Sequence, residues 1–228
     1  MRARSVCATH KSDETGKPAG AGNRPIRLAG SNLGDRAHIC AFFNSREDAY
    51  RVLLPFVKDG LESGRKTVHT IDPRRREEHV RWLASAGIDV NKNNQFELRD
   101  WADSHLNGRL FNQDKTLALW GKIVEDAKQK GFSLVQFVTE MEWALEAELD
   151  MNDLLEYEAK ANYVWLRGDG PYNPAICTYD LKRFRSDIVI DVMRTHPLAI
   201  IGGVLQENPF FVPPDEFLEH LRKKRDTV

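Results

Sequence analysis

The sequence is poor in the features that mark secreted, membrane-spanning and nucleic-acid-binding proteins. It has three cysteines, too few for a disulfide framework, which indicates a reducing compartment, and we expect a cytoplasmic protein. The formal net charge of −1 gives no basic footprint, so no direct contact with nucleic acid is expected. Apolar runs are short, and the N-terminus lacks an apolar signal core, so we expect no membrane span and no secretory signal.

The common catalytic motifs are also missing. The sequence contains no G-x-x-x-x-G-K-[ST] phosphate loop, no G-x-G-x-x-G and no G-x-S-x-G nucleophile elbow. The turn after the first expected strand reads Asn44-Ser45-Arg46, without a glycine that lets backbone amides wrap a phosphate. We therefore expect no catalytic residues and no cofactor.

Soft-metal ligands are present by residue type but not by spacing. His38, Cys40, Cys177 and His196 are suitable ligand types, yet the sequence has no C-x-x-C and no H-x-x-x-H pair. Small buried thiols are common in protein cores. The sequence therefore favours core cysteines and predicts no metal, although His196 remains the histidine most suspected of touching a ligand.

The apolar pattern alternates between short strand-like runs and helical periodicity. Strands are expected at 38–43, 66–71, 96–98, 134–138, 175–179 and 198–205, and helices at 45–63, 73–86, 113–130, 145–166, around 184–193, and at 215–224. Pro55 predicts a kink or break, and Gly202-Gly203 a bulge or close backbone packing. The alternation predicts a three-layer α/β domain over residues 36–228 with a mostly parallel sheet, after a disordered lead at 1–35.

Acidic residues follow several of the expected strands. Asp72, Glu140, Glu142 and Asp180 each come at the end of an apolar run, and the carboxyl ends of parallel strands share one edge of a sheet. These acids either line a pocket or merely cap helices and pair with arginines. The predicted pocket is lined by Asn44, Asp72, Glu140, Trp143, Tyr179, Asp180 and His196.

Five stretches carry a resemblance to a known family. They read HICAFFNSREDAYRVLLPFVKDGLESGRKTV, FVTEMEWAL, LLEYEAKAN, AICTYDLKRF and DVMRTHPLAIIGGVLQENPFFVPP. In these the chain resembles the MEDS family, sensory domains of methanogen and methylotroph regulators and of the dichloromethane-responsive repressor. The resemblance implies a module that senses small hydrocarbon derivatives or related metabolites. It also implies a relative of RecA/KaiC-type ATPases without the phosphate loop, with Glu140 at the Walker B strand end and Asp72 near a catalytic acid.

The resemblance sets the functional expectation. No output domain is evident, so we expect a non-enzymatic sensor that acts in trans on a signalling partner, which is a kinase, an anti-sigma factor or a transcription regulator. A homo-oligomer is compatible with the sequence. Segments 145–166 and 169–174 are the candidates for a moving part. Two alternatives stay open: a nucleotide-dependent ATPase or transferase, and a docking scaffold that has lost its ligand.

Overall fold

The computed structural model describes residues 25–33, 37–165 and 173–226. The first described elements are two short strands, β1 (Ile26–Leu28) and β2 (Ser31–Leu33), which pair antiparallel. They fall inside the lead that we expected to be disordered. The buried Leu28 and Leu33 side chains join the core beneath α1 (Arg46–Glu62), which explains why this part of the lead is ordered. The rest of the lead, residues 1–24 and 34–35, lies outside the described residues, as does most of the 169–174 segment.

The centre of the described structure is a seven-stranded sheet in the order β11-β10-β3-β9-β8-β4-β5. All neighbouring strands are parallel except β10 and β11, so the prediction of a mostly parallel α/β sheet is confirmed. The strands are β3 (His38–Phe43), β4 (Lys66–Ile71), β5 (Phe96–Asp100), β8 (Val135–Glu140), β9 (Ala175–Asp180), β10 (Leu198–Ile201) and β11 (Val204–Glu207).

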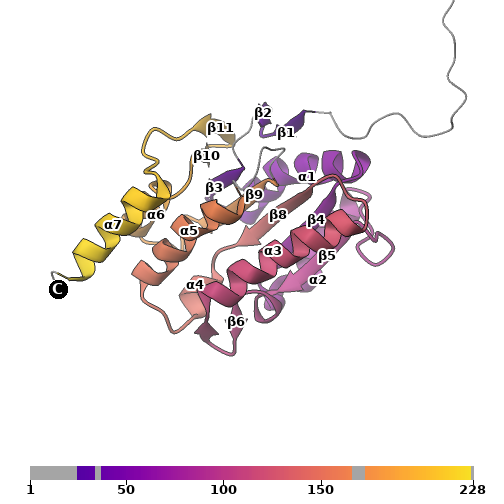
Figure 1. Cartoon of the computed structure of the whole chain (residues 1–228). Coiled ribbons are helices and arrows are strands. Elements are labelled where there is room, and N and C mark those ends of the chain that lie inside the picture. The colour runs from indigo at the N-terminus through magenta and orange to yellow at the C-terminus, as the bar shows by residue number, and fades with distance from the viewer. Residues whose placement is uncertain (1–24, 34–36, 166–172, 227–228) are drawn as a thin grey trace, which may run out of the picture.

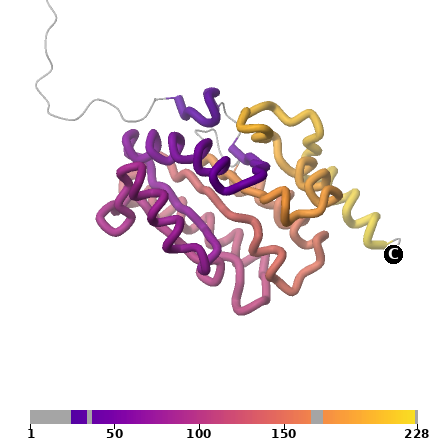
Figure 2. The backbone as a smooth tube through the Cα atoms, turned by 180° about the vertical axis from the view of Figure 1, so that it is seen from behind, coloured from indigo at the N-terminus to yellow at the C-terminus, as the bar shows by residue number. Residues whose placement is uncertain are grey.

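Helices cover both faces of this sheet (Figures 1 and 2). On one face lie α1 and α2 (Arg76–Ser85), and on the other lie α3 (Gln113–Gln129), α5 (Met151–Trp165) and α6 (Ser186–Met193). The C-terminal helix α7 (Pro214–Arg225) packs against α5. Short pieces complete the chain: η1 (Pro73–Arg75), η2 (Trp101–Asp103), the β6–β7 hairpin (Leu106–Asn107, Leu110–Phe111) and α4 (Trp143–Glu146).

Three local expectations differ from the structure. The expected strand 198–205 is a hairpin of β10 and β11, because Gly202 and Gly203 both have positive φ (60° and 79°), as a tight two-residue hairpin turn requires. The expected helix 145–166 is divided between α4 and α5 by an extended Ala147. Pro55 does not break α1, which runs continuously from Arg46 to Glu62.

Alternation along the central strands sorts side chains between the two layers. On β3, Cys40 and Phe42 face α5, whereas Ile39, Ala41 and Phe43 join the α1 core. The same alternation applies to β9. The sheet therefore presents one set of side chains beneath α1 and another beneath α5. A group of polar side chains lies within each of these two layers.

Candidate functional site

The carboxyl edge of the sheet gathers charged side chains beneath the start of α1. Ser45 caps this helix by accepting a hydrogen bond from the Asp48 amide, so Arg46 begins the first turn directly over β8. Arg46 Nη1 lies 2.6 Å from Glu140 Oε1, and Glu140 Oε2 accepts a hydrogen bond of 2.9 Å from the Asp72 amide. The ion pair is mostly buried, with 20% of the Arg46 side chain and 15% of the Glu140 side chain exposed.

An outer cavity of about 40 Å³ opens beside this ion pair. It is lined by Phe43, Ser45, Arg46, Ala49, Glu140, Glu142, Thr178, Tyr179 and Asp180. Such a volume holds a few water molecules or one very small ligand. Glu142 Oε1 accepts a hydrogen bond of 3.1 Å from the Asp180 amide, but its buried Oε2 has no hydrogen-bond partner among the described residues. Burial, with the nearby Glu140 carboxylate, raises the pKa of Glu142 to about 7.

A second, inner cavity of about 40 Å³ lies deeper, between α1, α2 and the strands β4 and β8. The two cavities share Arg46, Ala49, Glu140 and Thr178, so the Arg46–Glu140 ion pair lies where they meet. The remaining inner lining is largely apolar and comprises Tyr50, Leu53, Leu54, Val57, His69, Thr70, Ile71, His79, Leu83 and Val138.

The polar groups of the inner cavity form a short chain. Tyr50 Oη lies 2.7 Å from His79 Nδ1, and His79 Nε2 lies 3.0 Å from His69 Nδ1. Burial, with the positive charge of Arg46, lowers the pKa of His79 to about 4, and burial beside His79 lowers the pKa of His69 well below its usual range. Both imidazoles are therefore neutral at pH 7, and the inner cavity is uncharged apart from the ion pair.

The predicted pocket residues are distributed over several places. Glu140, Tyr179 and Asp180 line the outer cavity. Asp72 is buried next to it, where it caps η1 and binds the Arg74 guanidinium at 2.8 to 3.1 Å. Asn44 is exposed and is not among the residues that line either cavity.

Two other predicted residues lie elsewhere. Trp143 is fully buried and packs between the rings of His105 and Phe111, so it belongs to the core. His196 precedes β10, lines neither cavity, and enters a buried cluster beneath α5. Sequence reasoning did not select Arg46, Ala49 or Thr178. The capping serine before Arg46 was the only available sign that this arginine starts a helix over the strand ends.

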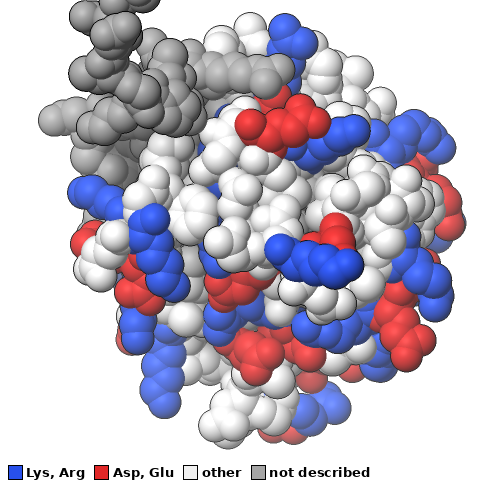
Figure 3. Space-filling view, turned by 90° about the vertical axis from the view of Figure 1, so that its right-hand side faces the viewer, with Lys and Arg blue, Asp and Glu red and all other residues white. Residues whose placement is uncertain are grey.

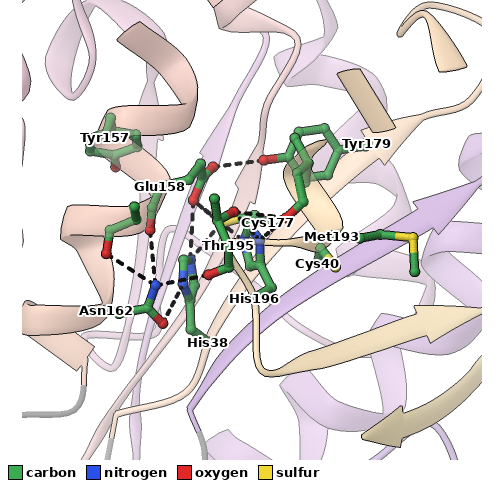
Figure 4. A network of polar contacts seen from close by, with 12 residues as sticks. His38, Cys40, Tyr157, Glu158, Asn162, Cys177, Tyr179, Met193, Thr195 and His196 are labelled. Atoms are coloured by element: carbon green, nitrogen blue, oxygen red, sulfur yellow. Dashed lines mark hydrogen bonds and ion pairs between the residues drawn. The ribbon is translucent and has the colours of Figure 1, made fainter. Parts of the chain in front are cut away.

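The cluster beneath α5 brings together four residues from distant parts of the chain (Figure 4). The ligand-type atoms of His38, Glu158, Cys177 and His196 all lie within 4.8 Å of one another. Glu158 Oε2 lies 3.2 Å from His38 Nε2 and 3.4 Å from His196 Nε2. Burial and the adjacent His196 ring lower the pKa of His38 to about 4. Glu158 is buried, yet the two histidines hold its pKa well below the usual range. The sequence had suggested His38, Cys177 and His196 by type, but Glu158 was missed.

A match to a protein-family model identifies the family of this chain. The model described as "MEDS: MEthanogen/methylotroph, DcmR Sensory domain" matches residues 37–197. The chain belongs to the MEDS family of sensory domains. The matched residues include the Arg46–Glu140 pair, Glu142 and all four members of the buried cluster, so both polar sites lie inside the MEDS domain.

Two further proteins are similar to this MEDS domain. The transcriptional repressor DcmR of Methylorubrum extorquens (strain DSM 6343 / CIP 106787 / DM4) is 24% identical over 201 residues, which cover 81% of this chain and 70% of the repressor. The flagellar accessory protein FlaH of Methanocaldococcus jannaschii has a crystal structure that aligns with a TM-score of 0.46 and 12% identity. That alignment covers 78% of each chain.

Two observations bear on contact with nucleic acid and with membranes. On the face shown in Figure 3, lysines and arginines alternate with acidic side chains and form no continuous basic stripe. Within the described part of the chain, no helix has both the length and the apolar character needed to cross a bilayer.

Proposed function

We propose that this MEDS domain is a ligand-binding sensor whose ligand is a small, largely apolar organic molecule held in the inner cavity beside the Arg46–Glu140 ion pair. The observation that carries the proposal is the inner cavity itself, which is lined mainly by apolar side chains and meets one polar pair at its mouth. Ligand sites typically combine such apolar walls with a few oriented polar groups.

The size of the cavities bears on the ligand class. Each holds about 40 Å³, which suits a molecule of a few non-hydrogen atoms. The small hydrocarbon derivatives implied by the family resemblance fall in this range. A nucleotide is far larger than either cavity, so the ATPase alternative gains no support from this edge of the sheet.

The polar groups at the mouth of the inner cavity allow the site to discriminate between ligands with and without a polar atom. The Arg46 guanidinium and the unpartnered Glu142 Oε2 are within the lining of the outer cavity, and the neutral His79 and Tyr50 are within that of the inner one. A ligand with one polar atom has partners near the mouth while its carbon or halogen atoms contact Leu53, Leu83 and Val138. Such a pairing of polar and apolar contacts favours small derivatives over bare alkanes.

Signalling requires that the ligand prefer one of two conformations of the protein. We propose that α1 is the responsive element, because it supplies Arg46, Ala49 and Leu53 to the lining and also supports the β1–β2 hairpin. The altered surface then acts on a separate signalling protein, as the relation to a transcriptional repressor suggests. A hydrogen-exchange comparison with and without ligand distinguishes α1 from segment 145–166 as the part that responds.

The test is stabilisation of the protein by a panel of one- to four-carbon alcohols, aldehydes, amines and halogenated alkanes. A ligand that binds only the folded state adds about 2.7 kcal/mol to the free energy of unfolding at 100 times its Kd. Ala49 lines both cavities, so Ala49→Leu fills the shared space and should abolish this gain. Ala84→Leu, on the exposed side of α2, is the matched control and should retain it. Stabilisation that survives in Ala49→Leu would refute the cavity as the binding site, and a panel without any stabilising compound would favour the docking scaffold.

A further inference from the structure

The buried cluster beneath α5 has the composition of a metal site. His38 comes from the start of β3, Glu158 from the middle of α5, Cys177 from β9 and His196 from the turn between α6 and β10. The His38, Glu158 and His196 side chains are 0% exposed, and Cys177 is 8% exposed. Two imidazoles, one thiol and one carboxylate are all ligand types that divalent zinc binds.

Four of the six distances among the ligand atoms are close to those of tetrahedral coordination, and all four atoms lie within 4.8 Å of one another. With Zn–N and Zn–O bonds of about 2.0 Å and a Zn–S bond of about 2.3 Å, a tetrahedron places nitrogen and oxygen about 3.3 Å apart, and sulfur about 3.5 Å from either. The observed distances from Glu158 Oε2 to the two Nε2 atoms are 3.2 and 3.4 Å. Cys177 Sγ lies 3.5 Å from His38 Nε2 and 3.8 Å from Glu158 Oε2.

The hydrogen bonds around the cluster fix the tautomer of His38. Asn162 Nδ2 donates to the carbonyls of Glu158, Ala159 and Thr195, so Asn162 Oδ1 is the atom that faces His38 Nδ1, at 3.3 Å. An amide oxygen only accepts, so His38 Nδ1 carries the proton. In the neutral ring, Nε2 then points an unshared electron pair at Glu158.

His196 is fixed in the same way. Its Nδ1 lies 2.9 Å from the carbonyl oxygen of Val192, which also only accepts, so Nδ1 donates and Nε2 is the ring atom that faces the cluster. This Nε2 is fully buried, lies 3.4 Å from Glu158 Oε2, and has no hydrogen-bond partner among the described residues. The two Nε2 atoms thus face one carboxylate oxygen, an arrangement that requires a cation, which is either a proton on an imidazole or a metal ion between the three atoms.

We propose that His38, Glu158, Cys177 and His196 bind one divalent transition-metal ion of the zinc class. Each imidazole donates a hydrogen bond from its Nδ1–H to an oxygen, and Tyr179 Oη donates at 2.7 Å to the non-ligating Glu158 Oε1, so outer contacts orient three of the four ligands. Four protein ligands in a closed, buried site are typical of a structural metal rather than a catalytic one. The ion would tie α5 and the α6–β10 turn to the two central strands.

Cobalt titration of the full chain tests this proposal. The metal-free protein, in a Cys7→Ser background so that only the two buried thiols remain, is titrated with Co²⁺ and then with Zn²⁺. We expect one equivalent of Co²⁺ to give the intense visible bands of tetrahedral cobalt and a thiolate-to-cobalt charge-transfer band, both removed by Zn²⁺. Absence of a saturable spectrum from protein shown to be folded by circular dichroism would overturn the proposal. The cluster would then be a protonated His–Glu network.

Paired variants assign the ligands. Cys177→Ser should lose the charge-transfer band, whereas Cys40→Ser, at the paired register position on β3 and outside the cluster, should keep it. A band that persists in Cys177→Ser overturns the assignment. Tyr179→Phe leaves every ligand in place and should weaken Co²⁺ binding on the order of 10- to 100-fold with an unchanged spectral shape. If Cys177→Ser does not fold, Tyr179→Phe still tests the proposal, because an unchanged Co²⁺ affinity in this variant contradicts the proposed orientation of Glu158.

Discussion

Replacing Glu142 with glutamine should stabilise the protein at neutral and alkaline pH. The Glu142 carboxyl is 5% exposed, and its Oε2 has no hydrogen-bond partner among the described residues. Burial and the Glu140 charge raise its pKa from 4.5 to about 7. At about 1.4 kcal/mol per pKa unit, this difference corresponds to about 3 kcal/mol of folding free energy. Glutamine keeps the acceptor for the Asp180 amide but carries no charge.

The pH dependence follows from the direction of this shift. Below pH 4.5 the Glu142 carboxyl is protonated in both folded and unfolded chains, so it costs nothing. Between pH 4.5 and 7 the folded protein holds the proton more tightly than the unfolded chain does, and wild-type stability falls as the pH rises. Above pH 7 the buried carboxylate lowers the free energy of unfolding by the full amount of about 3 kcal/mol. The Glu142→Gln variant should therefore have about the same free energy of unfolding as wild type at pH 4, and a value about 3 kcal/mol higher than wild type at pH 8.

Urea denaturation at a series of pH values from 4 to 8.5 measures this difference directly. The matched control is Glu62→Gln, at an exposed position near the end of α1, whose difference from wild type should stay small throughout. A Glu142→Gln difference that does not change with pH, or a loss of stability at pH 8, would contradict a destabilising buried charge at Glu142. Either outcome would mean that the carboxylate has stabilising partners in the folded protein.

Two substitutions test the packing that supports the sites. In α1, a Cβ built on Gly60 overlaps the buried Gln136 side chain of β8, whereas one built on Gly121 in α3 meets nothing within 4 Å. Gly60→Ala should therefore destabilise by about 1 to 3 kcal/mol, and Gly121→Ala should stabilise by up to about 1 kcal/mol, as measured by thermal unfolding; equal effects would contradict the clash. Asn208 donates to the carbonyls of Met193 and His196. Asn208→Ala should cost about 2 kcal/mol in urea denaturation and Asn208→Asp more, because a carboxylate would face two carbonyl oxygens.

The alternation of apolar runs and helical periodicity was enough to predict the layers of this fold. The buried strands β3, β8 and β9, of which β8 and β9 end in a partly exposed acid, appear in the sequence as short apolar runs, and α3 shows its periodicity clearly. Local turns were harder. The Gly202-Gly203 pair gives a hairpin rather than a bulge because both residues adopt positive φ, a conformation that the residue type allows but does not require.

The candidate sites depend on tertiary placement more than on local motifs. Acids at strand ends were predictable, because parallel strands share a carboxyl edge. The contact between Arg46 and Glu140 was not, because it depends on Ser45 capping α1 just after β3 ends. Glu158 lies in an acidic amphipathic segment, where solvent exposure is the ordinary expectation for a carboxylate. The long-range pairing that buries it against His38 and His196, across 120 and 38 positions, leaves no spacing motif in the sequence.

The most direct test of the proposed sensor is a methyl NMR titration with the compound that stabilises the protein most. We expect that methyl signals of Leu53, Leu83 and Val138, which line the inner cavity, shift saturably with a common Kd. The exposed Leu110, in the β6–β7 hairpin and in neither cavity lining, should not shift. Shifts centred elsewhere, or saturable shifts of the same cavity methyls in Ala49→Leu, would contradict the claim that a small ligand occupies this cavity.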